Sequence, residues 1–213
     1  MDKMKIESGR EYRSMVLDAL DDEKVVEGYA TTFDEPYELY AYHDEFGNEK
    51  SVREVVDKES FEGTDMSDVI MQYDHEGRVY ARLSNGTLEL EVDEHGLKVR
   101  ANLGGTELGR NLYEEIRGGY TNKMSFGFSV GDAHMEADER GYLRTIKRFK
   151  KLYDVSAVSL PANDFTELSA RKQCDGVIAE LEAERLRAEE ERHAVECRKE
   201  SLAKRLESLK KGD

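Results

Sequence analysis

The sequence predicts a mainly β protein of the α+β class. We expect a small antiparallel β-barrel of about seven strands, wrapped by helices, followed by a long C-terminal helix. Short segments that alternate apolar and polar residues recur between 25 and 160. Dipeptides suited to tight turns, Asn85-Gly86 and His95-Gly96, separate several of them. After Cys174 the alternation gives way to an apolar repeat of seven residues, which is typical of a long helix.

The N-terminal part contains two short strands in this interpretation. Residues 25–31 are rich in β-formers, and residues 33–37, with a proline, turn the chain. Residues 38–50 are predicted as a polar loop. A second strand at 51–56 is followed by a helical turn at 58–61.

The segment from 69 to 103 predicts an antiparallel meander of strands at 69–73, 78–83, 88–92 and 97–103. Its third strand alternates Leu88, Leu90 and Val92 with glutamates, so one face should be buried and the other solvated.

A helix and three more strands complete the predicted barrel. Thr106 is the expected N-cap, and Leu108, Leu112 and Ile116 recur on one helix face before a Gly-Gly pair ends the helix. Strands are predicted at 123–130, 142–149 and 152–160, and Pro161 closes the last one.

Residues 1–170 are predicted to form this barrel domain and residues 171–213 a charged helical tail. Arg185, Arg192 and Lys199 interrupt the second position of the tail's repeat, so a paired coiled coil and a solvated single helix both remain open. The apolar positions that recur every seven residues are Cys174, Leu181, Ala188, Val195, Leu202 and Leu209.

The charge distribution argues against several classes of partner. Residues 171–213 carry 11 basic and 11 acidic residues, so the whole net charge of -15 lies in residues 1–170. Such a surface repels phosphate backbones, which argues against nucleic-acid binding as the main role. A basic protein partner fits the charge, and so does plain solubility.

The chain is expected to be a cytoplasmic protein. It contains no run of roughly 20 apolar residues that would span a bilayer, and its first residues lack the apolar core of a secretory signal. Cys174 and Cys197 would lie about 35 Å apart along one helix, too far for a disulfide, which fits a reducing compartment.

Ser125 is the candidate nucleophile. In the strand around it, Met124, Phe126 and Phe128 should face the core while Ser125 and Gly127 face the other way. A rigid strand with a glycine beside the serine leaves room for a substrate backbone. Ser129, on the same face, is the alternative nucleophile.

His75 and Asp154 are the candidate partners of Ser125. His75 shares the parity of Tyr73, which places it at the end of a half-buried strand, and histidine titrates near neutral pH as a general base requires. Asp154 lies among apolar and small residues, where an unpaired carboxylate would cost several kcal/mol. A histidine would satisfy this charge, although backbone amides or Arg148 remain structural alternatives.

Three segments in this order resemble the tailed-bacteriophage prohead maturation proteases, a family related in fold to the herpesvirus assemblins. They are Tyr73-Asp-His-Glu76, Met124-Ser-Phe-Gly-Phe128 and the run from Asp154 to Asn163. The resemblance spans about residues 20–170. It implies a small β-barrel with His75 as base and Ser125 as nucleophile. One departure is that the phage family usually has Glu where this chain has Asp154.

The resemblance also implies an activity, its substrates and the place where the protein acts. Such an enzyme is a serine endopeptidase that cleaves the major capsid protein precursor, scaffold segments and itself inside the prohead assembling in the host cytoplasm. The assemblin likeness suggests a homo-oligomer, and backbone N–H groups are expected to stabilise the oxyanion. No cofactor is expected, and no metal, since the histidines lack metal-ligand spacing. The alternative function is a non-catalytic capsid assembly chaperone or scaffolding protein that acts through its C-terminal helix.

Overall fold

The computed structural model describes residues 11–20, 24–44, 46–159 and 164–210. The chain divides into two compact units, Met1–Gln173 and Cys174–Asp213. The elements are β1 (Glu11–Leu20), β2 (Val25–Thr32), β3 (Tyr37–His43), β4 (Glu49–Val56), β5 (Ile70–Tyr73), β6 (Glu76–Arg82), a 3-10 turn (Leu83–Asn85), β7 (Leu88–Val92), β8 (Gly96–Asn102), α1 (Glu107–Arg117), β9 (Lys123–Asp138), β10 (Gly141–Val158) and α2 (Asp164–Lys210).

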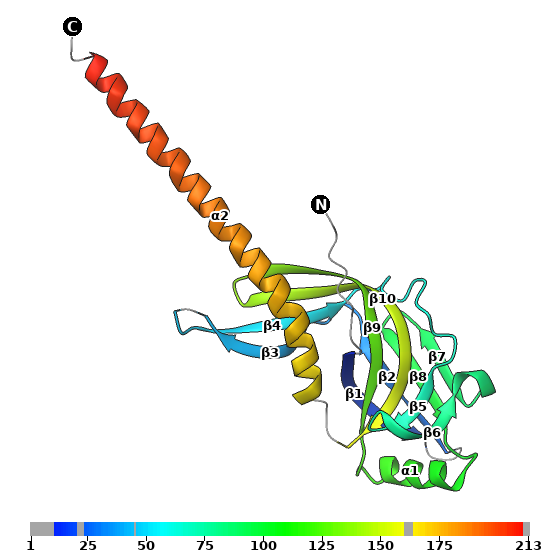
Figure 1. Cartoon of the computed structure of the whole chain (residues 1–213). Coiled ribbons are helices and arrows are strands. Elements are labelled where there is room, and N and C mark those ends of the chain that lie inside the picture. Colours follow the sequence, from blue (N-terminus) through cyan, green and yellow to red (C-terminus); the bar gives the residue numbers. More distant parts are fainter. Residues whose placement is uncertain (1–10, 21–23, 45, 160–163, 211–213) are drawn as a thin grey trace. The chain divides into compact units, whose positions relative to one another are not determined.

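The strands form one curled sheet that stays open (Figure 1). Eight of them follow the order β3-β4-β10-β9-β1-β2-β8-β7, and β5 and β6 branch from β10. The fold is therefore mainly β, as predicted, but the expected seven-stranded closed barrel is wrong. Of the helices expected around the sheet, α1 packs on it, against β1, β2 and β6.

The sheet is not wholly antiparallel. Residues 141–146 of β10 pair in parallel with β4, and residues 154–157 of the same strand pair in parallel with β5. Register shifts between β9 and β10 at 146–154 bend this long hairpin between the two partners. The two separate strands predicted at 142–149 and 152–160 are therefore one continuous strand up to Val158.

Two N-terminal predictions need correction. The strand β1 was not predicted at all, and the predicted polar loop at 38–50 contains β3 and the beginning of β4. The true loop is only the hairpin tip, where a carboxylate oxygen of Asp44 accepts bonds from the backbone amides of Phe46 (3.0 Å) and Asn48 (2.8 Å). Charged residues on an exposed hairpin resemble a loop in the sequence.

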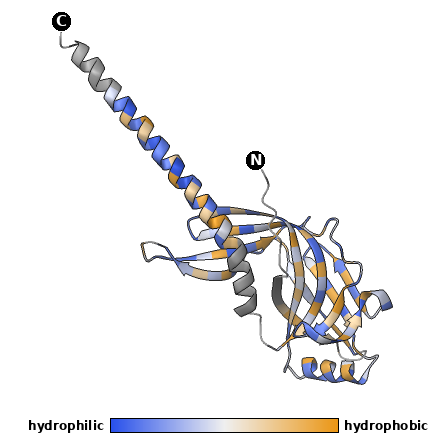
Figure 2. Cartoon of the chain, viewed as in Figure 1, coloured by the Kyte–Doolittle hydropathy of each residue, from blue (hydrophilic) through white to orange (hydrophobic). Residues whose placement is uncertain are grey.

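The four strands predicted between 69 and 103 and the helix that follows them are present, but the predicted continuous meander is wrong. The strands form two separate hairpins, β5–β6 and β7–β8, and β6 does not pair with β7 in the described part of the chain. Leu97, Val99 and Ala101 of β8 are buried while polar residues alternate with them, a pattern visible along the strands in Figure 2. Thr106 caps α1 as expected, since its hydroxyl accepts a bond from the Gly109 amide at 2.9 Å. Leu108 differs from the prediction because it is exposed.

An aromatic cluster fills the core beneath the two longest strands. Phe128 and Phe149 meet edge to face at 4.9 Å between ring centroids, and the Phe61 ring lies tilted against Phe149 at 4.6 Å between centroids. Phe126 lies 4.7 Å from Phe128. Buried aromatic rings of this kind contribute most to core energetics, so they fix the position of β9 and β10.

A buried ion pair ties β10 to β4. Arg144 donates to Glu54 at 2.8 Å, and both side chains are almost fully buried. Tyr37 donates a further hydrogen bond to the same carboxylate from β3. A buried charge needs such partners because isolation in the interior is costly, so these contacts fix the three-strand arrangement at this end of β10.

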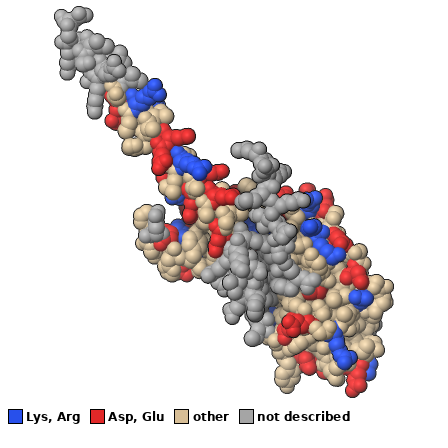
Figure 3. All heavy atoms as spheres, viewed as in Figure 1, with Lys and Arg blue, Asp and Glu red and all other residues tan. Residues whose placement is uncertain are grey.

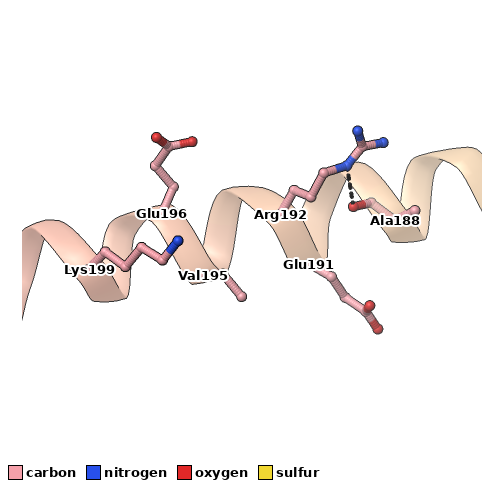
Figure 4. Close-up of a pocket in the computed structure, with 6 residues that line it drawn as sticks. All are labelled: Ala188, Glu191, Arg192, Val195, Glu196 and Lys199. Carbon is pink, nitrogen blue, oxygen red and sulfur yellow. Dashed lines mark hydrogen bonds between the residues drawn. The ribbon is translucent and has the colours of Figure 1, made fainter.

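The helix α2 begins at Asp164, earlier than the predicted start near Cys174. Along its described face, Ala188 and Val195 alternate with Arg192 and Lys199, and Arg192 bonds the Ala188 carbonyl at 3.2 Å (Figure 4). Val195 is more than half exposed. The pairing of α2 with a partner helix in a coiled coil stays a prediction. In the part of the chain that the structure describes, no helix combines the length and apolarity needed to cross a membrane.

Candidate active site

Ser125 lies in the middle of β9, on the face opposite the core phenylalanines. Met124, Phe126 and Phe128 are fully buried in the hydrophobic core, and this fixes the alternation of the strand. The strand is paired on both sides, with Ser125 opposite Ser14 of β1 and opposite Ser156 of β10. The serine is therefore held on a rigid backbone, and it is 0 % exposed.

Asp154 lies on β10, directly opposite Gly127 of β9. Opposed residues of an antiparallel pair share a face, so Asp154 and Ser125 lie on the same side of the sheet. Gly127 presents no side chain between them. The carboxylate is 1 % exposed and therefore needs a partner.

His75 comes from a tight turn rather than from the end of a strand. Tyr73 of β5 pairs with Glu76 of β6, which leaves Asp74 and His75 as a two-residue hairpin loop. Both have positive φ, 48° and 60°, as a type I′ turn requires. The predicted strand parity of His75 is thus wrong, because the turn and not the pleat directs the imidazole. A non-glycine residue in this conformation is strained and often marks a functional site.

Asp74 fixes this turn to the end of β10. Its amide donates to the Ala157 carbonyl at 2.9 Å. Its carboxylate accepts from the Ser159 amide at 2.9 Å and from the Ser159 hydroxyl at 3.0 Å. Because β10 also carries Asp154, these bonds hold the histidine turn at a defined distance from the buried carboxylate.

The three predicted side chains form one hydrogen-bonded line. His75 Nδ1 lies 2.8 Å from Asp154 Oδ2 and 3.1 Å from Oδ1. On the other side of the ring, Nε2 lies 2.7 Å from Ser125 Oγ. The imidazole is 13 % exposed, so both bonds lie in a largely water-excluded place. The structure thus brings together segments that are 50 and 79 residues apart in the chain.

This arrangement determines which nitrogen carries the proton. An ionised Asp154 can only accept, so Nδ1–H of His75 must donate to it. Nε2 is then left as the acceptor for the hydroxyl of Ser125. A hydroxyl that donates to a neutral, oriented imidazole is the arrangement needed for nucleophilic acyl transfer.

The alternatives to these residues are less favoured by the geometry. Ser129 is buried on the same strand face, and its hydroxyl has no partner among the described residues, whereas Ser125 contacts the imidazole. Arg148, the alternative partner of Asp154, is exposed and lies opposite Asp132 in the β9–β10 register. The contacts found for Asp154 are those with His75.

An ion pair supports the segment of β10 just before Asp154. Lys151 donates to Asp65 at 2.7 Å, and Ser67 adds bonds from its hydroxyl and amide. These hydrogen bonds lower the pKa of the exposed Asp65 carboxyl well below its usual range, and the bond from Lys151 has the largest effect. The ionised Asp65 therefore stabilises the fold at a pH above the ordinary pKa of a carboxyl group. This stabilisation is lost as the pH falls towards the lowered pKa of Asp65.

Within the described residues, no group of three or more His, Cys, Asp or Glu side chains is placed to hold a metal ion. Two of the remaining histidines have other contacts. His95 packs edge to face on Tyr29 at 4.6 Å between ring centroids, and His193 lies beside Cys197 on α2.

Two residues of the site were missed by the sequence analysis. Asp74 is not singled out in the sequence analysis, although aspartate is a common first residue of a two-residue type I′ turn. Ser156 was not considered, although it shares the strand parity of Asp154. Both follow from register, which a single sequence does not reveal.

Comparison with protein-family models gives a match. The model of a family described as caudovirus prohead serine protease matches residues 11–177. This match confirms the resemblance drawn from the three sequence segments around His75, Ser125 and Asp154. No curated protein and no solved structure matches the chain.

Proposed function

Because this chain belongs to the caudovirus prohead serine protease family, we propose that it is a maturation endopeptidase with Ser125 as nucleophile, His75 as general base and Asp154 as the acid that orients the base. The observation that carries the proposal is the line of hydrogen bonds from Ser125 through His75 to Asp154, at 2.7 and 2.8 Å. The alternation of β9 places Ser125 in this line. The β5–β6 hairpin turn places His75, and the β9–β10 register places Asp154.

The geometry supports a two-step acyl transfer. His75 Nε2 takes the hydroxyl proton as Ser125 Oγ attacks a peptide carbonyl, and Asp154 stabilises the imidazolium that forms. The imidazolium then gives the proton to the leaving amine, which leaves an acyl-enzyme. A water molecule, activated by the same nitrogen, releases the product acid and restores the serine.

The proposed substrates are the segments removed from the capsid protein precursor and from scaffold protein during head assembly, together with segments of the protease itself. Acidic and basic side chains are interspersed on the face shown in Figure 3, while the net charge of -15 makes the protein acidic as a whole. An acidic enzyme attracts basic substrate segments over roughly the Debye length, about 8 Å at physiological salt.

Incubation of the purified protein with capsid protein precursor from the same phage tests the function. We expect defined new termini in the precursor, identified by mass spectrometry, and the same cleavage in the presence of EDTA, because the proposed chemistry uses side chains alone. A precursor that keeps its original mass would contradict the proposed function. Cleavage that stops in EDTA would contradict the serine mechanism.

Asp74→Ala should lower kcat for precursor cleavage by about 10- to 100-fold, because a histidine displaced by about 1 Å loses its alignment with Ser125. Unfolding should also become easier by about 1 kcal/mol, through loss of the bonds to Ser159. Activity per folded molecule and thermal unfolding are measured in parallel.

Asp93→Ala is the matched control for this variant. Asp93 holds the β7–β8 turn through the amides of His95 and Gly96, at 2.8 and 2.9 Å, as Asp74 holds the histidine turn. The Asp93→Ala variant should be less stable than the wild type and keep the same kcat. Equal kcat values for the two variants would show that Asp74 has no role in positioning His75.

A further inference from the structure

Ser156 lies beside the proposed nucleophile. In the β9–β10 ladder it is directly opposite Ser125, and it is two residues from Asp154 on the same strand. Opposed residues of an antiparallel pair share a face, with Cβ atoms about 4.5–5.5 Å apart. The hydroxyl of Ser156 therefore lies on the face that carries Ser125 and Asp154.

This hydroxyl is buried and lacks a hydrogen-bond partner among the described residues. Ser156 is 0 % exposed, and its Oγ makes no hydrogen bond in the described part of the chain. An unsatisfied buried hydroxyl destabilises a protein, and folded proteins retain few of them. An unsatisfied hydroxyl next to a nucleophile is explained if the substrate brings its hydrogen-bond acceptor.

The amide of Ser125 itself is not placed to be one of the backbone oxyanion donors that the sequence analysis expects. Residues 123–128 of β9 pair with β1 on one side and with β10 on the other. The amide of Ser125 therefore belongs to a sheet ladder and does not point towards the carbonyl oxygen of a bound peptide. A side chain on the same face is better placed to donate.

We propose that the hydroxyl of Ser156 donates a hydrogen bond to the oxyanion of the tetrahedral intermediate. As Ser125 Oγ bonds to the carbonyl carbon, its proton passes to His75 Nε2, and the carbonyl π pair moves onto the oxygen. That oxygen gains the Ser156 donor, and the bond is released when the carbonyl forms again and the amine leaves. The inference rests on the proposed peptidase function and adds a catalytic residue to it.

Ser156→Ala tests the inference, with a peptide that spans a site cleaved by the wild-type protein. Removing one oxyanion donor lowers kcat by about 100- to 1,000-fold. We expect this loss in kcat with little change in KM and no shift in the pH profile set by His75. Thermal stability should stay equal or rise, because the substitution removes an unsatisfied hydroxyl. Ser156→Cys, which retains a weak donor, should have an intermediate kcat.

Ser60→Ala is the matched control. Ser60 is also 0 % exposed with an unpartnered hydroxyl, but it lies between β4 and β5, where its carbonyl accepts from Phe149. Its loss should leave kcat unchanged. A kcat for Ser156→Ala within threefold of wild type, or an equal loss in both variants, would overturn the inference. A wild-type protein that cleaves no precursor would instead contradict the proposed function itself.

Discussion

Ser125→Ala should abolish cleavage of the capsid protein precursor, with a fall in kcat/KM of at least about 10,000-fold. The variant loses the atom that forms the acyl bond, and members of such a triad act as a unit, so the other two residues recover little of the rate. The fold should persist, because the change removes one hydroxyl and its bond to His75, at a net cost of about 1 kcal/mol.

Intact-mass analysis of the purified wild-type and Ser125→Ala proteins, alone and with precursor, measures this effect. Self-processing products should appear only in the wild type. Ser129→Ala is the matched control, because it changes a second buried serine of the same strand face. If Ser125→Ala cleaves normally and Ser129→Ala does not, Ser129 is the nucleophile. A wild-type protein that promotes head assembly without any cleavage would favour the assembly chaperone.

Asp154→Asn should lower kcat by about 10,000-fold while the protein stays folded. An asparagine amide can donate to His75 Nδ1, and this favours the tautomer in which Nε2 carries the proton and cannot accept from Ser125. Asp154→Glu keeps the charge and should retain far more activity. Its longer side chain changes the distance to the ring, which is 2.8 Å in the native protein.

Activity per folded molecule and thermal unfolding separate catalysis from structure at this position. The catalytic role predicts a large loss of turnover with a melting temperature close to that of the wild type. A sharp fall in melting temperature with normal turnover of the remaining folded protein would make Asp154 a structural residue that only satisfies buried neighbours.

The fold could be predicted where local pattern decides structure. The alternation in 88–103 and the capped helix after Thr106 give the correct elements, because each contains its own burial pattern. Long-range pairing could not be predicted. The parallel contacts of β10 with β4 and β5 depend on bulges, and bulges leave no mark in the alternation of a single sequence.

The site shows the same limit. Ser125 and Asp154 were identified because a small or charged residue interrupts an apolar strand. His75 was identified correctly but from strand parity, which is the wrong reason. The direction of its imidazole comes from the positive φ of a two-residue turn. Ser156 and Asp74 gain their importance only from neighbours in other strands, so their contribution becomes visible once the register is known.

The complete burial of Ser125 also has a kinetic consequence. Under the proposed function, a peptide reaches this hydroxyl only in molecules that have opened, so the apparent affinity for the substrate is reduced by the fraction of molecules that are open. If opening costs about 2.8 kcal/mol, that fraction is about 1 %. We therefore expect the proposed protease to cleave dilute proteins slowly and substrates concentrated with it inside a closed shell much faster.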